Sequence, residues 1–386
     1  MSTVLPRRPA GIVIRRIGAS SSLIPSSVTA RAQTSAAGRP TTELRLTECT
    51  PEFVYESRVA GISAFISPGR SLSKTLGRVE LADRLGYDAA YTTHIAGRDS
   101  LTTLMAYADV SERIRLGTGV VPIFSRTPAT MAQTAATIDE HSGGRMVLGL
   151  GVSHRVTVEN WHGATIDKPV TQMREYVGIV RAILRGEAPP QGEFFNTRFQ
   201  FMGYEPRPAL PIYVAALSPN MLRLAGEIAD GVMLWLCNPG YIREVVVPEV
   251  TEGRRRAGKA LDGFDVVAAV PVALTDDPDA ARATMRQDLI TYASLPFYRS
   301  MLERSGFGDE IAAFDEGMQA GDTESAKAGL SDRMLGALAG FGSAEEVRAT
   351  VQRYREAGAI SPCVGGVPRT DFDGALEAVA ELISPR

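Results

Sequence analysis

The chain has 386 residues and a nearly balanced charge, with 41 basic and 44 acidic side chains and a formal net charge of −3. Such a balance excludes the broad basic field that nucleic-acid binding requires. The hydrophobic fraction of 44% and the charged fraction of 22% are typical of a globular protein with enough apolar material for a core. We therefore expect a soluble protein without a nucleic-acid partner.

Cysteine spacing and hydropathy narrow the class further. Cys49, Cys237 and Cys363 are widely separated and form no CxxC pair. This argues against a zinc site or a disulfide framework and is typical of a reducing cytoplasm. No apolar run approaches the roughly 18 residues of a membrane span. We expect a cytoplasmic protein with no metal and no membrane partner.

The first 42 residues contain six Arg and no acidic residue, since Glu43 is the first carboxylate. This composition resembles a transit peptide but lacks the continuous apolar stretch of a secretory signal. A disordered tail or an over-extended start explains the same composition. We expect residues 1–57 to be a tail and residues 58–386 to form one folded domain; an organelle address is the alternative for the tail.

From about residue 58, short apolar strands alternate with helical patterns. Pro128 favours a helix start, and Gly86 and the Gly143-Gly144 pair favour helix ends. In the first half of the chain the pattern predicts strands at 59–66, 89–92, 114–121 and 146–150. It predicts helices at 81–85, 101–110, 128–141 and 170–184, the last after a loop of about twenty residues.

Residues 187–210 interrupt this alternation. The segments 193–195 and 198–201 are rich in Phe and flank Asn196-Thr197, which predicts a small inserted hairpin. The alternation then resumes, with strands predicted at 212–216, 231–236, 264–274 and 360–367. Helices are predicted at 219–229, 241–257, 279–293, 343–357 and 371–383, and 295–330 reads as a second, largely helical insertion.

Eight strands that alternate with helices, most of them continuously apolar, indicate a parallel sheet buried on both faces. A closed (β/α)₈ barrel explains the number of strands best. The alternative, a doubly wound dinucleotide-binding sheet, needs a Gly-rich first turn, which Ser67-Pro68-Gly69-Arg70-Ser71 does not supply. We therefore predict a TIM barrel with insertions.

Barrel enzymes carry their sites at the carboxyl ends of the strands. His94 follows the second predicted strand, where an imidazole could transfer a proton near neutral pH, or could be an ordinary loop residue. Arg98 and Asp99 are expected to start the next helix, with Asp99 at its positive end. Trp235, after the sixth strand, is expected to form a wall of the barrel mouth.

Glycines and small polar residues mark three more strand ends. Gly117 and Gly119 suggest a bulge or a close backbone approach to a flat ligand, or else a simple turn before Pro122. Gly149 and Gly151 leave space for a planar ligand, and Ser153 and His154 follow them with a hydroxyl and an imidazole. Ser218, with Pro219 behind it, is either an ordinary N-cap or an N-cap that also holds a phosphate.

Five segments together resemble the luciferase-like monooxygenase superfamily, most closely its deazaflavin branch, which uses coenzyme F420. The likeness runs from about residue 58 to the C-terminus. The segments are Gly86-Tyr87-Asp88-Ala89-Ala90-Tyr91, Arg115-Leu116-Gly117-Thr118-Gly119-Val120, Ser142-Gly143-Gly144-Arg145-Met146-Val147-Leu148-Gly149-Leu150-Gly151, Ile228-Ala229-Asp230-Gly231-Val232 and Gly342-Ser343-Ala344-Glu345-Glu346-Val347.

The resemblance implies a (β/α)₈ barrel, a homodimer and a hydride transfer between coenzyme F420 and a small organic substrate. It implies a non-proline cis peptide at Gly119–Val120 behind the cofactor ring, and His94 as an acid or base beside the reacting carbon. The residues implied to bind the cofactor, including its phosphate at the third group, are Gly119, Val120 and Val121; Gly151, Val152, Ser153 and His154; and Ala215, Ala216, Leu217 and Ser218.

Two departures from the branch matter. Thr93-His94 stands where many deazaflavin reductases have an Asp-His pair, and Val152-Ser153-His154 lacks the acidic ending of a sugar-phosphate dehydrogenase branch. The second departure argues against a phosphorylated sugar. An FMN-dependent monooxygenase that uses dioxygen and a non-catalytic cofactor-binding barrel are the alternatives. The substrate pocket is expected to be lined by residues 155–168, the hairpin near 194–201 and the insertion at 295–330.

Overall fold

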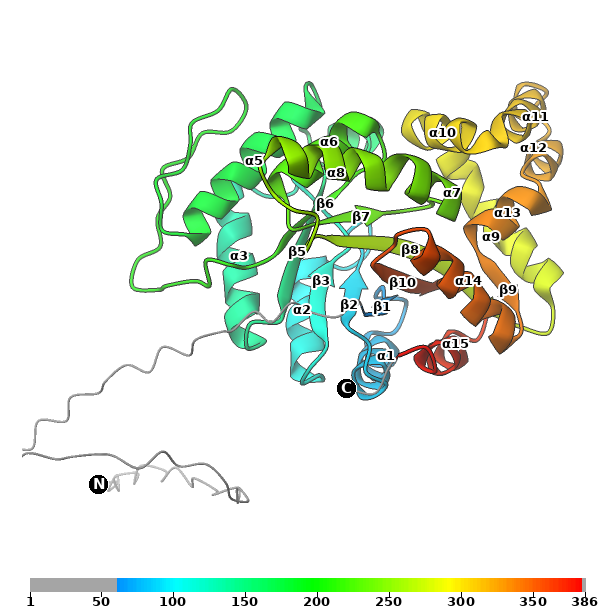
Figure 1. The fold of residues 1–386 in the computed structure, drawn as a ribbon, viewed down its shortest axis with the longest axis horizontal. Coiled ribbons are helices and arrows are strands. Elements are labelled where there is room, and N and C mark those ends of the chain that lie inside the picture. Colours follow the sequence, from blue (N-terminus) through cyan, green and yellow to red (C-terminus); the bar gives the residue numbers. More distant parts are fainter. Residues whose placement is uncertain (1–60, 384–386) are drawn as a thin grey trace, which may run out of the picture. The chain divides into compact units, whose positions relative to one another are not determined.

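The computed structural model describes residues 61–383, so the predicted tail at 1–57 lies outside the described residues. Within 61–383, eight parallel strands close into a barrel with helices around it (Figure 1). The ring runs β1-β2-β3-β5-β6-β7-β8-β10 and closes because β10 pairs with both β8 and β1. The predicted (β/α)₈ barrel is confirmed. Its strands are β1 Ser63–Phe65, β2 Ala89–Thr92, β3 Arg115–Thr118, β5 Met146–Gly151, β6 Ile212–Ala215, β7 Gly231–Leu234, β8 Asp265–Leu274 and β10 Ser361–Gly366.

Helices connect the strands, and most begin where the sequence supplies a cap. Thr127 and Ser218 accept backbone N–H bonds at N-caps that Pro follows, and Ser343 and Glu346 form a capping box. The helices between the first six strands of the ring are α1 Leu72–Arg84, α2 Ser100–Asp109, α3 Pro128–His141, α4 Arg155–Trp161, α5 Pro169–Leu184 and α6 Pro219–Ile228. None of the described helices is long and apolar enough to cross a membrane.

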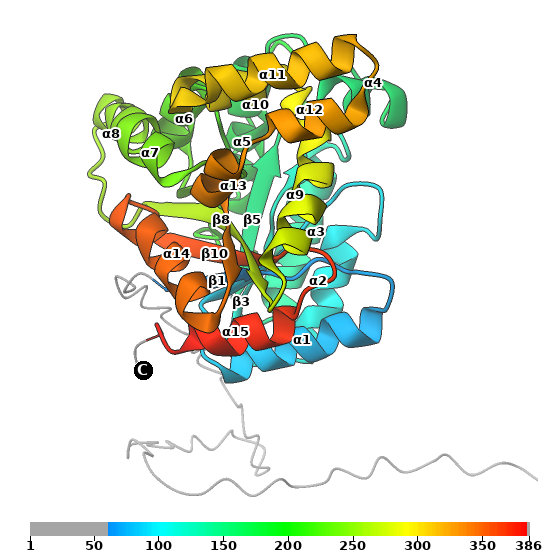
Figure 2. The same cartoon turned by 90° about the vertical axis from the view of Figure 1, so that its right-hand side faces the viewer.

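The second half of the described chain is richer in helix. The predicted helical insertion at 295–330 is confirmed (Figure 2). The remaining helices are α7 Pro239–Tyr241, α8 Val247–Arg256, α9 Pro278–Ala293, α10 Pro296–Leu302, α11 Gly308–Gln319, α12 Thr323–Gly329, α13 Asp332–Leu338, α14 Ala344–Glu356 and α15 Phe372–Ala380, with π-helical segments at Ile242–Val246 and Glu303–Phe307. The short strand β9 Gly340–Gly342, which pairs with β8, was not predicted.

A buried ionic network fills the amino-terminal end of the barrel. Arg115, at the start of β3, pairs with Asp88 and lies 3.6 Å from a carboxylate oxygen of Asp265. The Tyr213 hydroxyl accepts from Arg115 at 3.1 Å and donates to Asp265 at 2.9 Å. Above this network an apolar cluster fills the barrel: Ala89, Tyr91, Val147, Tyr213, Met233, Val267 and Cys363. The interior of the described barrel is therefore filled below the carboxyl ends of its strands.

The third predicted strand, 114–121, is not continuous. β3 ends at Thr118, the peptide bond Gly119–Val120 is cis, and the two-residue strand β4 Val121–Pro122 follows. The cis bond lies where the resemblance implied one. Gly119 stays in line with the sheet because its N–H donates to the Thr92 carbonyl at 2.8 Å.

The hairpin predicted within 187–210 is wrong, because no described residue between α5 and β6 forms a strand. The Glu175 carboxylate of α5 accepts the backbone N–H groups of Glu193, Phe194 and Phe195, which a hairpin would have needed. The Phe195 ring packs edge-on against Tyr176 instead of against a partner strand. The loop before α5 also differs from the prediction, since it contains α4.

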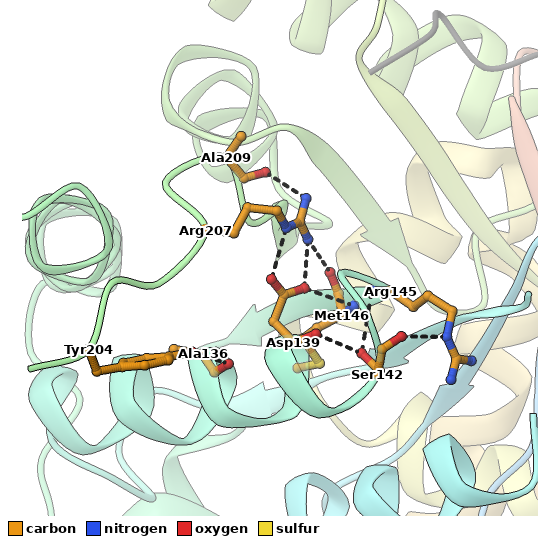
Figure 3. Close-up of polar contacts among 8 residues, drawn as sticks. All are labelled: Ala136, Asp139, Ser142, Arg145, Met146, Tyr204, Arg207 and Ala209. Carbon is orange, nitrogen blue, oxygen red and sulfur yellow. Dashed lines mark hydrogen bonds and ion pairs between the residues drawn. The ribbon is translucent and has the colours of Figure 1, made fainter. Parts of the chain in front are cut away.

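The end of this long loop is anchored at the start of β5 by Arg207 (Figure 3). Its guanidinium donates to both carboxylate oxygens of Asp139 at 2.8 and 2.7 Å, and Asp139 also accepts from the Met146 N–H at 3.2 Å. One turn earlier in α3, the Ala136 carbonyl accepts from the Tyr204 hydroxyl at 2.9 Å. The loop that leads into β6 is thereby tied to the helix that leads into β5.

We expect Arg207→Met to lower the free energy of unfolding by about 2–4 kcal/mol, because it leaves the buried Asp139 carboxylate without its cation. Denaturant unfolding followed by circular dichroism measures the change. The matched control is Arg155→Met, which breaks an exposed ion pair with Glu159 and should change stability little. Equal effects of the two variants would contradict the assignment of Arg207 as an anchor.

Candidate active site at the barrel mouth

The barrel brings the three sequence-predicted cofactor segments side by side. Pro122 stands opposite Gly151, and Leu150 stands opposite Val214. A Cβ placed on Gly151 would lie 2.6 Å from Val120 Cγ2 and 3.6 Å from Ala215 Cβ. Val120, Gly151 and Ala215, nearly 100 residues apart in sequence, therefore form one continuous surface at the mouth.

The segment after β5 turns sharply. Ser153 has a φ of +59°, a left-handed conformation that is uncommon for a residue other than glycine and often found at functional sites. His154 is the N-cap of α4 but makes no side-chain cap bond. Its ring lies 5.8 Å from that of Tyr298 in α10, and burial lowers the pKa of the imidazole. Val152, Ser153 and His154 are all partly buried at the mouth.

After β6, the residues Ala215 to Ser218 lead directly into α6. The Ser218 hydroxyl accepts from the Met221 N–H at 3.4 Å, which confirms the N-cap prediction. Ala216 N–H donates to the Met233 carbonyl, and the Leu217 carbonyl accepts from the Tyr241 hydroxyl at 2.7 Å. The backbone of this turn is therefore held by β7 and α7.

His94 lies just beyond β2, partly buried. Its Nδ1 is 3.0 Å from the Ser100 hydroxyl and accepts from the Ser100 backbone N–H at 3.3 Å. Because Nδ1 accepts, a neutral His94 ring carries its proton on Nε2. Burial lowers the pKa of His94, and Arg126 and His162 lower it further, while Asp99 opposes the change. The neutral imidazole is the favoured form.

The helix-start prediction for Arg98 and Asp99 holds for one residue only. Asp99 caps α2 by accepting from the Thr102 N–H at 2.8 Å, and it also pairs with Arg126. Arg98 instead donates to the carbonyl oxygens of Gly69 and Arg70, on the loop after β1. Its side chain ties two neighbouring loops together.

At the strand-end glycines, neighbouring protein atoms occupy the space that a side chain would need. This corrects the prediction that the missing side chains leave space for a planar ligand. A Cβ on Gly149 would strike the Thr118 carbonyl oxygen and would lie 2.7 Å from Met233 Sδ. A Cβ on Gly119 would lie 2.6 Å from the ring of Phe65. These positions need glycine because the barrel itself is close-packed there.

A cavity of about 240 Å³ opens beside this surface, between the ends of β1, β7 and β10 and helix α9. Trp235 lines it, as predicted for a mouth wall, and packs edge-on against Phe65. None of the residues predicted to bind the cofactor lines it. None of the residues at 155–168, 194–201 and 295–330, predicted to line the substrate pocket, lines this cavity; its residues include Phe65, Ser67, Arg78, Thr93, Trp235, Asp288 and Tyr292.

The sequence analysis did not predict that Phe65, Asp288 and Tyr292 line a cavity. Phe65 could have been found, since it ends β1 and the same strand-end rule selected the other sites. Asp288 and Tyr292 lie within α9, whose sequence pattern is that of an ordinary surface helix. Among the described residues, no group of three or more His, Cys, Asp or Glu side chains is placed to hold a metal ion.

The chain belongs to the luciferase-like monooxygenase family, whose sequence model matches residues 58–361. It is 31% identical to a 5,10-methylenetetrahydromethanopterin reductase from Archaeoglobus fulgidus, over 80% of this chain and 94% of the relative. It is 29% identical to a putative coenzyme F420-dependent oxidoreductase from Mycobacterium tuberculosis, over 72% of this chain and 87% of the relative. The predicted membership of an oxidoreductase family is confirmed.

Several solved structures share the fold of this chain. The coenzyme F420-dependent tetrahydromethanopterin reductase from Methanopyrus kandleri superposes with a TM-score of 0.72 at 25% identity, covering 84% of this chain and 99% of that one. An F420-dependent secondary alcohol dehydrogenase has a TM-score of 0.67 at 19% identity, and an FMN-bound Baeyer–Villiger monooxygenase has 0.58 at 17%. These last two likenesses show the shared fold alone.

We expect Gly119→Ala to lower the free energy of unfolding by about 1–3 kcal/mol, because the new methyl group overlaps the Phe65 ring. Thermal and denaturant unfolding measure the loss. In a Phe65→Leu background, which removes the contacted ring atoms, the loss should shrink; a double-mutant cycle gives the coupling. Gly69→Ala is the control, since no atom lies within 4 Å of its Cβ position. A loss of the same size in both backgrounds would contradict the packing argument.

Proposed function

We propose that this chain is a coenzyme F420-dependent oxidoreductase that transfers a hydride between the cofactor and a small organic substrate. The observation that carries the proposal is the single surface formed by Val120, Gly151 and Ala215 at the mouth. The coenzyme F420-dependent relatives and their fold support it.

The residues present fit a flat, anionic cofactor. In the proposed arrangement its ring lies against Gly119, Val120 and Val121, while Gly151 to His154 line one side. Its phosphate lies at the turn from Ala215 to Ser218, where the ten-residue helix α6 begins. A helix N-terminus favours an anion, and no acidic residue occurs in α6 before Glu227. The turn therefore offers donors without a repelling carboxylate.

The deazaflavin supplies a ring carbon that accepts or releases a hydride, and the protein supplies binding, orientation and the exclusion of water. His94 is the proposed proton carrier. Its Nδ1 is occupied by Ser100, so Nε2 is the atom left to exchange a proton with the substrate. In the neutral ring Nε2 already carries a proton, so His94 would offer that proton to the substrate as a donor or acid and would not take one up there.

Titration of the purified protein separately with coenzyme F420 and with FMN tests the choice of cofactor. We expect saturable binding of coenzyme F420, seen in its absorbance and fluorescence, and weaker binding of FMN. Ser218→Ala should weaken coenzyme F420 binding, whereas Ser331→Ala, at the N-cap of α13, is the control. Tight FMN binding with no response to coenzyme F420 would favour the monooxygenase alternative, and no binding of either would favour a barrel without turnover.

The role of His94 is tested by His94→Ala. We expect turnover to fall about 10²–10⁴-fold, the usual contribution of a positioned acid or base, with coenzyme F420 affinity retained. His141→Ala, at the exposed end of α3, is the control. Stopped-flow reduction of the cofactor and equilibrium titration separate the two quantities. Unchanged turnover in His94→Ala would remove this residue from the mechanism.

A further inference from the structure

The cavity beside the mouth has an unusual combination of linings. Most of its wall is apolar, contributed by residues such as Ile66, Leu236, Pro271, Met285 and Leu289. Aromatic rings of Phe65, Trp235, Tyr292 and Phe372 complete the wall. The two charged side chains among the lining residues are Arg78 and Asp288. Only these two side chains can therefore set the preference of the cavity for a positively or negatively charged ligand.

The positive charge of Arg78 is already compensated. Its Nε donates to the Asp373 carboxylate at 2.6 Å, and its guanidinium lies over the Phe372 ring at 5.4 Å from the centroid. Asp288 differs, because it makes no hydrogen bond or ion pair with any residue in 61–383. The uncompensated charge on the wall of the cavity is therefore negative.

The surroundings of Asp288 favour a cation further. Tyr292 lies one helical turn along α9, with its ring 6.0 Å from that of Trp235. Burial raises the pKa of the Tyr292 hydroxyl, and the Asp288 charge raises it further. Asp288 is exposed; partial desolvation raises the pKa of its carboxyl group, and no basic side chain among residues 61–383 pairs with it. Indole and phenol rings attract cations through their π faces, most strongly where water is excluded.

The cavity also lies next to the proposed cofactor surface without sharing its residues. Phe65 makes the connection, since its ring lines the cavity and also lies against Gly119. In Figure 2, α9 lies at the front of the barrel beside β8, the strand that contributes Pro271 to the cavity. A molecule in the cavity thus sits one aromatic ring away from the Gly119–Val120 peptide.

We propose that this cavity is a ligand pocket beside the proposed cofactor surface and that Asp288 selects there a compact, mostly apolar molecule that carries a protonated amino group, and rejects anions. The charge selection does not rest on the proposed function. Asp288 acts here as a specificity-determining residue: its carboxylate pairs with the ammonium group while the aromatic rings cover the apolar body. The pocket volume limits the ligand to a small ring or short chain.

The test compares three probes with one skeleton: cyclohexylamine, cyclohexanol and cyclohexanecarboxylate. The chain has two tryptophans, Trp161 and Trp235, so Trp161→Phe leaves Trp235 in the cavity wall as the sole indole reporter. Fluorescence titration and calorimetry of this full-length variant measure binding with and without coenzyme F420. We expect the amine to bind at least about tenfold more tightly than the carboxylate, with the alcohol between them.

In Asp288→Asn, which keeps the shape of the side chain, the preference for the amine over the carboxylate should fall to less than about threefold. Asp279→Asn is the matched control, because Asp279 is on the same helix but pairs with Arg282 on the surface. Thermal unfolding checks that each variant is folded. Equal binding of the three probes, or an unchanged preference in Asp288→Asn, would overturn the proposal.

The experiments distinguish a failure of the pocket proposal from a failure of the proposed function. Loss of coenzyme F420 binding with the amine preference intact would sink the proposed function and leave the pocket selective. Coenzyme F420 binding with no preference among the probes would sink the pocket proposal alone.

Discussion

Closure of the parallel sheet is the constraint on which the rest of the structure depends. When β10 pairs with β1, through the register Ser63 to Cys363, every strand points the same way around one ring. The amino-terminal end is filled by the Arg115 network and the middle by an apolar cluster. Chemistry is therefore confined to the carboxyl-terminal mouth, where loops from distant parts of the chain meet.

Close packing at the mouth explains why positions 119 and 149 are glycine better than space for a planar ligand does. Gly119 and Gly149 are glycine because Phe65 and Thr118 occupy the volume that a side chain would need. The same Phe65 ring then forms part of the cavity wall. Rigid packing around Phe65 therefore links the Gly119–Val120 peptide to the adjoining cavity.

Charge is distributed unevenly between the two ends of the barrel. At the amino-terminal end the buried ions compensate one another, as the cost of burying charge requires. At the mouth, Asp99 is paired with Arg126 and Arg78 with Asp373, but Asp288 is left alone on the cavity wall. An exposed carboxylate without a partner, on the wall of a cavity lined by aromatic rings, can pair with a ligand that carries the opposite charge.

The sequence by itself determined the barrel, the positions of its strands, and local features such as the caps at Asp99 and Ser218, because hydrophobic period and capping are read from neighbouring residues. Its resemblance to a family located the Gly119–Val120 peptide. Only the tertiary structure decided that Glu175 takes the N–H groups of a supposed hairpin, that Phe65 fills the space beside Gly119, and that Asp288 faces a cavity without a partner. The first contact joins residues 18 to 20 positions apart, the second joins residues 54 positions apart, and the cavity gathers residues from 65 to 372. No local pattern encodes which of these side chains will meet.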